Sequence, residues 1–210
     1  MTVFRFILLG YAFIGFFVAG GVFFKKVGRA NFTLTCFILL LSCEVLYFLY
    51  STSNLFTQYP LIIGAIYFPM GFLYGPLLLF HFNALIANNQ KLKLWHYLQF
   101  VPALIMFIAI WDIAILPFEE RVAYIEANFL GRIMTYNYLR AGHQLLYGLL
   151  LIWVFVKKKK SVPDNQKLYL LLMSVIYVLS TVLISWFTLF ADNWRQFIFF
   201  YFLVYTVVFA

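Results

Sequence analysis

Six polar side chains lie within or at the edges of long apolar segments, where ionisable groups are costly and are candidates for function. At 1.5 Å of rise per residue, Glu44 in one segment lies within about 5 Å in depth of Arg140 and His143 in another. Hydrogen bonding and ion pairing are the chemistry that these residue types offer. The sequence therefore predicts a pocket, open to the outside, for a small polar or amphipathic ligand, formed by Glu44, Asp112, Asn137, Arg140, His143 and Gln144.

A structural role is the alternative interpretation of the same residues. Asn137, Arg140 and Gln144 recur at the i, i+3, i+7 spacing of one helical face. An ion pair between Glu44 and either Arg140 or His143 would hold two helices together without binding anything. Both interpretations require that the two helices are neighbours.

These side chains must be positioned by membrane-spanning helices, because the apolar segments are long and continuous. A bilayer core of ~30 Å needs about 20 apolar residues of helix, whereas barrel strands alternate over segments of about ten. The sequence predicts seven spans, at residues 6–24, 32–51, 60–86, 95–116, 136–156, 168–190 and 197–210. The last one provides about 21 Å of helix and is expected to be incomplete. The chain, 1–210, is expected to form a single all-α transmembrane domain, a polytopic helix bundle.

The composition supports a membrane protein and excludes several other classes. Hydrophobic residues make up 65% of the 210 residues and charged residues 10%, against ~45–50% and about 25% in soluble domains. A soluble domain of this size could not cover so many apolar side chains. A cytosolic enzyme, a secreted disulfide scaffold and a disordered tail are therefore excluded.

The net charge of +8 comes from three short loops that hold all nine lysines and Arg29, ten of the fifteen basic residues. By the positive-inside rule these loops are cytoplasmic, so the N-terminus lies outside and, after seven spans, the C-terminus lies in the cytoplasm. The charge thus indicates orientation, and no direct nucleic-acid contact is expected. The residues expected to anchor the topology and to attract anionic lipid are Lys25, Lys26, Arg29, Lys157, Lys158, Lys159 and Lys160.

The third predicted span contains two prolines and two glycines at regular spacing. Pro69 and Pro76 each remove a backbone donor, and their seven-residue separation predicts two bends on one face. Gly71 and Gly75 form a small-xxx-small pair, which lets a neighbouring helix approach closely. The span is either a bent packing helix or a hinge with two arrangements.

The same span carries a resemblance to a known family. Its string Phe72-Leu73-Tyr74-Gly75-Pro76-Leu77-Leu78, with Pro69 before it and His96 and Phe100-Val101-Pro102 after it, resembles the membrane region of bacterial membrane-anchored AraC-type transcriptional regulators. The resemblance implies a multi-helix sensor region in the cytoplasmic (inner) membrane that controls a cytoplasmic helix-turn-helix domain. No such domain lies within residues 1–210, so these residues are expected to be the sensor half of a longer protein.

No arrangement of residues supports catalysis. The sequence contains no HExxH, GxSxG, P-loop or dinucleotide motif, and its three histidines lack metal-ligand spacing. We expect no enzyme, no cofactor and no metal. The expected partners are the lipid bilayer, an unidentified small-molecule or membrane signal and, as one option, a second copy in a homodimer. The rival interpretation is a small transporter, although transporters commonly break helices in paired positions and only one span is broken here.

Overall fold

The computed structural model describes residues 2–25, 28–51, 53, 64–86 and 94–190. These ranges are almost entirely helical and contain no strand, so the predicted all-α fold class is confirmed. The short elements η1 and η3 are 3-10 helices, and η2 is a π-helix. The elements are α1 (Thr2–Lys25), α2 (Arg29–Ser51), α4 (Gly64–Gly71), α5 (Tyr74–Ile86), α6 (Leu94–Tyr97), η1 (Leu98–Phe100), α7 (Val101–Ala114), α8 (Phe118–Ala127), η2 (Phe129–Ile133), α9 (Met134–Lys158), η3 (Lys159–Ser161) and α10 (Asp164–Phe190).

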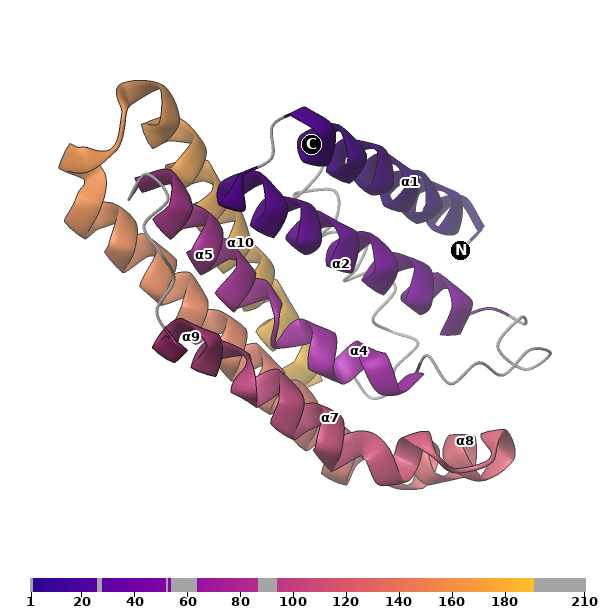
Figure 1. The fold of residues 1–210 in the computed structure, drawn as a ribbon. Coiled ribbons are helices and arrows are strands. Elements are labelled where there is room, and N and C mark those ends of the chain that lie inside the picture. The colour runs from indigo at the N-terminus through magenta and orange to yellow at the C-terminus, as the bar shows by residue number, and fades with distance from the viewer. Residues whose placement is uncertain (1, 26–27, 52, 54–63, 87–93, 191–210) are drawn as a thin grey trace.

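Helices α4 and α5 form the centre of the bundle (Figure 1). Helix α2 packs on α5 from one side and α9 packs on it from another, while α7 packs on α4. Helix α1 lies outside α2, and α10 lies against α9. The stretch Tyr67–Ile86, which includes the junction of α4 and α5, is the most buried of the long apolar stretches described. Helix α8 and the α9–α10 turn lie at opposite ends of the bundle (Figure 1).

Two clusters of buried apolar side chains make up most of the core. The first joins α1, α2, α7, η2 and α9, and includes Leu8, Val45, Ile113 and Ile133. The second joins α2, α5, α9 and α10, and includes Phe37, Leu78, Leu151 and Leu170. In α2 and in α9, one part of the helix packs in the first cluster and another part in the second. Glu44 of α2 and Arg140 of α9 lie between these parts.

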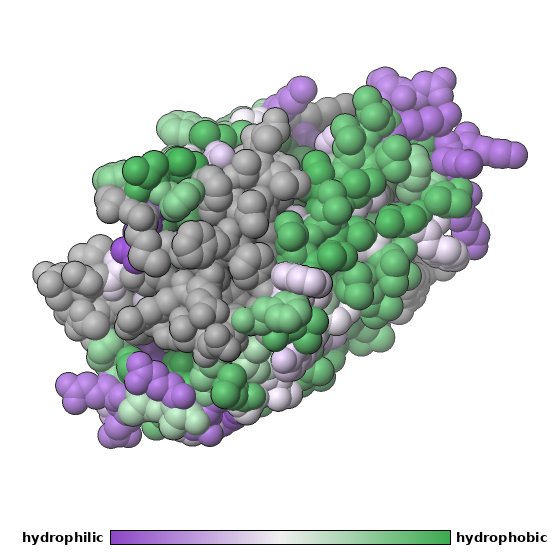
Figure 2. Space-filling model, turned by 180° about the vertical axis from the view of Figure 1, so that it is seen from behind, coloured by the Kyte–Doolittle hydropathy of each residue, from purple (hydrophilic) through white to green (hydrophobic). Residues whose placement is uncertain are grey.

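Five of the described helices are long and apolar enough to cross a membrane, or six if Leu98–Ala114 and Phe118–Ala127, bent by 114°, count as one span. The five match the predicted spans 6–24, 32–51, 60–86, 136–156 and 168–190, and the bent pair begins in 95–116. The predicted span 197–210 lies outside the described residues. Figure 2 shows a hydrophobic belt between hydrophilic side chains at the two ends. These helices suit a multi-pass membrane protein, and its orientation stays a prediction.

The third predicted span, where the sequence predicts bends at Pro69 and Pro76, is interrupted between α4 and α5. Helix α4 ends at Gly71, and the N–H groups of Phe72 and Leu73 donate to carbonyls three residues earlier, at 3.1 and 2.9 Å. This i→i−3 pattern tightens the chain before α5 starts at Tyr74. Pro76 falls in the first turn of α5, where N–H groups have no intrahelical acceptor. Pro76 therefore helps to start a new helix and bends no existing one.

Candidate functional site

A buried ion pair joins α2 to α9 at the centre of the bundle. Nη1 of Arg140 lies 3.3 Å from Oε1 of Glu44, and the two side chains are 1% and 7% exposed. The Tyr74 hydroxyl donates a hydrogen bond to the other carboxylate oxygen of Glu44. The Arg140 guanidinium carbon also lies 4.5 Å from the ring centroid of Tyr67, a cation–π distance. Of the two predicted pairs the structure contains the one with Arg140, and two tyrosines complete it.

The end of α4 is shaped to receive Arg140. A Cβ at Gly71 would overlap Cδ of Arg140 and lie 2.6 Å from its Cγ, so only glycine leaves room for the arginine stem. Nε2 of Gln144 donates to the Gly71 carbonyl at 3.0 Å. The last carbonyls of a helix lack intrahelical donors and carry partial negative charge. At the end of α4, Arg140 thus supplies positive charge and Gln144 supplies a hydrogen-bond donor to the Gly71 carbonyl.

Gly75 lies against Tyr147 as Gly71 lies against Arg140, and Tyr147 is two turns further along α9 than Arg140. A Cβ at Gly75 would lie 2.5 Å from Cβ of Tyr147 and 2.8 Å from its Cδ2. The Tyr147 hydroxyl donates to Oε1 of Gln99 at 3.4 Å. The predicted glycine pair therefore lies against α9. The side chains of Arg140 and Tyr147 fill the space beside the two glycines.

Beside the ion pair, α9 carries polar atoms that are buried and unsatisfied within the described part of the chain. They are both ring nitrogens of His143, Oδ1 of Asn137 and Oε1 of Gln144. The His143 ring lies between Phe72 and Tyr147, with centroid distances of 4.9 and 4.7 Å. Buried polar atoms in native proteins are nearly always hydrogen-bonded, to protein, water or ligand. The unsatisfied atoms of His143 and Gln144 lie close to the break, where Phe72 and Gly71 contact these two residues.

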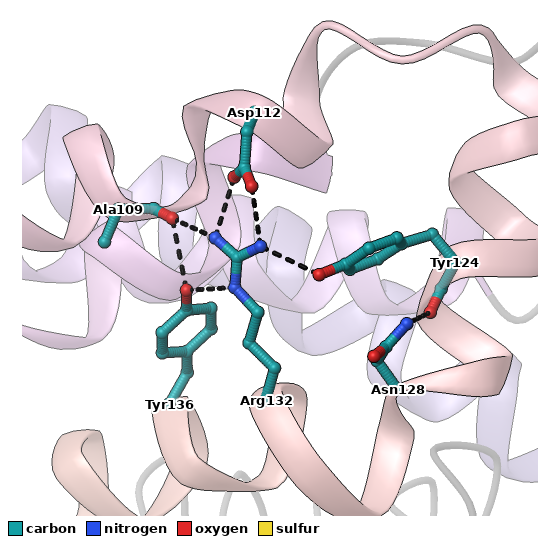
Figure 3. Close-up of polar contacts among 6 residues, drawn as sticks. All are labelled: Ala109, Asp112, Tyr124, Asn128, Arg132 and Tyr136. Carbon is teal, nitrogen blue, oxygen red and sulfur yellow. Dashed lines mark hydrogen bonds and ion pairs between the residues drawn. The ribbon is translucent and has the colours of Figure 1, made fainter.

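A second polar cluster surrounds Arg132, which lies in η2 just before the start of α9 (Figure 3). Its guanidinium forms two bonds to the Asp112 carboxylate, at 2.6 and 2.8 Å, and one to the Ala109 carbonyl at 2.6 Å. It also donates to the hydroxyls of Tyr124 and Tyr136, at 2.8 and 2.5 Å. These contacts use all five N–H groups of the arginine. Arg132 therefore fastens α8 and α7 to the start of α9.

Asp112 does not lie with the other residues of the predicted pocket around Glu44 and Arg140. Its side chain is 61% exposed and pairs with Arg132, whereas Glu44 pairs with Arg140. Similar depth along the helices suggested one cluster, but depth does not specify which face of a helix a side chain occupies. The sequence analysis also missed Tyr67 and Tyr74. Their i, i+7 spacing on the broken span was the available signal, because it places two polar-tipped rings on one face.

Replacing Arg132 by lysine is expected to loosen α8 without unfolding the bundle. Lysine keeps the charge but lacks the planar fork that serves Asp112, Ala109 and both tyrosines at once. Hydrogen bonds to charged groups are worth roughly 1.5–3 kcal/mol each. Backbone amides of residues 118–127 should exchange with deuterium about tenfold faster, as expected for ~1.4 kcal/mol.

Mass spectrometry of peptides from residues 118–127 measures this exchange, and Glu120→Gln, on the exposed side of α8, is the matched control. Equal exchange in the Arg132→Lys variant and the wild type would show that Arg132 does not hold α8.

The remaining predicted positions carry positive charge near helix ends. Lys25 is the last residue of α1 and Arg29 the first of α2, while Lys26 lies outside the described residues. The lysines 157–160 occupy the end of α9 and the following turn. Within the described ranges no group of three or more His, Cys, Asp or Glu side chains is placed to hold a metal ion.

Together these observations define the class of protein: a helical bundle with several helices of membrane-spanning length and a charged, buried centre beside a broken helix. No protein-family model, curated protein or solved structure matches this chain.

Proposed function

We propose that this chain is the membrane-embedded sensor region of a bacterial AraC-type transcriptional regulator. In this proposal it lies in the cytoplasmic membrane, with its N-terminus outside and its C-terminus in the cytoplasm. The observation that carries the sensing role is the buried Glu44–Arg140 pair beside the break between α4 and α5. The resemblance in residues 69–78 and 96–102 supports the AraC-type output, and the three lysine loops support the orientation.

A buried ion pair is a poor device for stability alone. Burying each charge costs several kcal/mol, and apolar residues of similar volume often give an equally stable protein. The contact between Arg140 and Glu44 is monodentate and 3.3 Å long. A polar ligand that hydrogen-bonds to Glu44 or Arg140 would replace the contact that this residue loses when the ion pair separates. The pair therefore suits an equilibrium between two arrangements that a ligand biases by binding one of them better.

The break between α4 and α5 would couple the separation of Glu44 from Arg140 to a movement of these two helices. Arg140 and Gln144 contact Gly71 at the end of α4, whereas Tyr74 at the start of α5 bonds to Glu44. Separation of Arg140 from Glu44 would change contacts on both sides of the break. Helices α4 and α5 would then shift relative to each other, because Phe72 and Leu73 join them outside either helix.

The far end of α5 is tied to the neighbouring helices at the end that the proposal places in the cytoplasm. Nδ1 of His81 donates to the Ala30 carbonyl and Nε2 accepts from the Tyr169 hydroxyl, both at 2.8 Å. Nζ of Lys158 donates to Oδ1 of Asn83 at 3.5 Å. A shift of α5 would therefore reach the ends of α2, α9 and α10.

Deleting the gene in its host is expected to change the transcript levels of a defined set of genes several-fold. The native full-length protein should restore them, and RNA sequencing measures both effects. Transcripts that stay unchanged under every condition in which the protein is made would contradict the proposal. Unchanged transcripts together with lost uptake of a solute would instead identify a transporter.

A further inference from the structure

The turn between α9 and α10 presents lysines on a fixed platform. Lys157 and Lys158 end α9, and Lys159 and Lys160 lie in η3. Val162 directly after η3 is 4% exposed and packs in the second core cluster. The N–H of Gln166 donates to the Pro163 carbonyl at 2.9 Å, which closes the turn before α10. The lysine backbone is therefore held by the core on both sides.

The lysines of this turn differ in how their charge is satisfied. Nζ of Lys167 lies 2.6 Å from Oδ1 of Asp164, so that lysine is neutralised. Lys158 is half-buried and donates to Asn83. Lys157, Lys159 and Lys160 are exposed and form no salt bridge with a described residue. Three ammonium groups in one turn therefore remain for an anion from outside the described chain.

The surface that leads to these lysines is apolar. Leu149, Trp153 and Val156 are exposed and recur at i, i+4, i+7, so they form one face of α9. Nζ of Lys157 lies 4.7 Å from the Trp153 ring centroid, which places the ammonium group directly above this face. Figure 2 shows hydrophobic side chains of the belt adjoining hydrophilic ones at this end of the bundle. An acyl chain fits the face, and a phosphate fits the lysines above it.

We propose that this turn is a binding site for one anionic phospholipid, with its phosphate held by Lys157, Lys159 and Lys160 and an acyl chain along Leu149, Trp153 and Val156. Charge complementarity selects an anionic over a zwitterionic headgroup. The apolar face selects a lipid over free phosphate, because only a lipid covers Trp153. The site does not depend on a signalling role of the chain.

Native mass spectrometry of the purified chain in detergent tests the site by titration with phosphatidylglycerol, phosphatidylcholine or soluble glycerol phosphate. We expect phosphatidylglycerol to bind most tightly. Lys160→Gln should weaken it about fivefold, and Lys157→Gln/Lys159→Gln/Lys160→Gln by about 100-fold. The control Asp164→Asn/Lys167→Gln removes the neighbouring ion pair at unchanged net charge and should keep the wild-type affinity.

Three results would overturn the proposal. Equal affinity for phosphatidylglycerol and phosphatidylcholine would show that the lysines act only on membrane orientation. Unchanged binding in the Lys160→Gln variant, which replaces one exposed side chain and keeps the fold, would place the lipid elsewhere. Glycerol phosphate binding as tightly as phosphatidylglycerol would show that the apolar face takes no part.

Discussion

Replacing Glu44 by leucine is expected to lower the free energy of unfolding by about 3–5 kcal/mol. The variant leaves the Arg140 guanidinium, 1% exposed in the wild type, without its carboxylate, and removes the acceptor of the Tyr74 hydroxyl. A buried charge that loses its partner costs far more than the intact pair contributes. Titration of the purified protein with SDS in mixed micelles measures the change.

The double variant Glu44→Leu/Arg140→Met is the matched comparison. It removes both charges, so it should recover most of the loss and stay below the wild type only by the roughly 1–3 kcal/mol that comes from removing the acceptor of the buried Tyr74 hydroxyl. Such a rescue separates the cost of an unpaired charge from the value of the pair. The single variants Glu44→Leu and Arg140→Met complete the comparison. If the loss of stability in the double variant equals the sum of the losses in the two single variants, Glu44 and Arg140 do not interact and the ion pair is not present.

Gly75→Ala should destabilise the protein by about 1–3 kcal/mol, the range found for overpacked cores. The new Cβ would meet the root of the Tyr147 side chain, 2.5 Å from its Cβ, so the ring cannot avoid it by rotation alone. Helices α5 and α9 would have to move apart. Gly71→Ala should cost less stability, because the stem of Arg140 has more rotatable bonds, but it should displace the guanidinium from Glu44.

Gly142→Ala is the control for both glycine variants, since nothing lies within 4 Å of a Cβ at that position of α9. Alanine favours the helix over glycine by roughly 0.5–1 kcal/mol, so this variant should be as stable as the wild type or slightly more so. The same SDS titration compares the three proteins. Equal stabilities of the Gly75→Ala and Gly142→Ala variants would contradict the close approach of α5 to α9.

The sequence specifies the helices better than it specifies their neighbours. Long apolar runs predict α1, α2, α9 and α10 because a membrane-spanning helix is recognisable from length and composition alone. Matching depth also predicts that Glu44 pairs with Arg140 or His143, and the structure shows the pair with Arg140. The same reasoning fails for Asp112, because depth does not specify which face of a helix a side chain occupies and its partner Arg132 lies in η2, outside the predicted spans.

The prolines show a second limit. A proline inside a continuous helix bends it, and the sequence analysis treats Pro69 and Pro76 alike. In the structure the chain tightens at Phe72 and Leu73, so Pro76 stands at the start of a new helix, where it costs nothing. Gly71 and Gly75 flank the break, and the side chains of Arg140 and Tyr147 fill the space beside them. The spacing of the two glycines indicates a close approach of another helix, but it does not specify which side chains of that helix fill the space.

In the proposed function the buried Glu44–Arg140 pair serves signalling, and stability does not require it. RNA sequencing can follow, across growth conditions, the transcripts that change when the gene is deleted. Cells with the wild-type protein are compared with cells that carry Glu44→Leu/Arg140→Met at equal abundance in the membrane. The account predicts that the wild type changes them several-fold between conditions and that the stable double variant holds them at one constant level. A double variant that responds with the same amplitude as the wild type would contradict it.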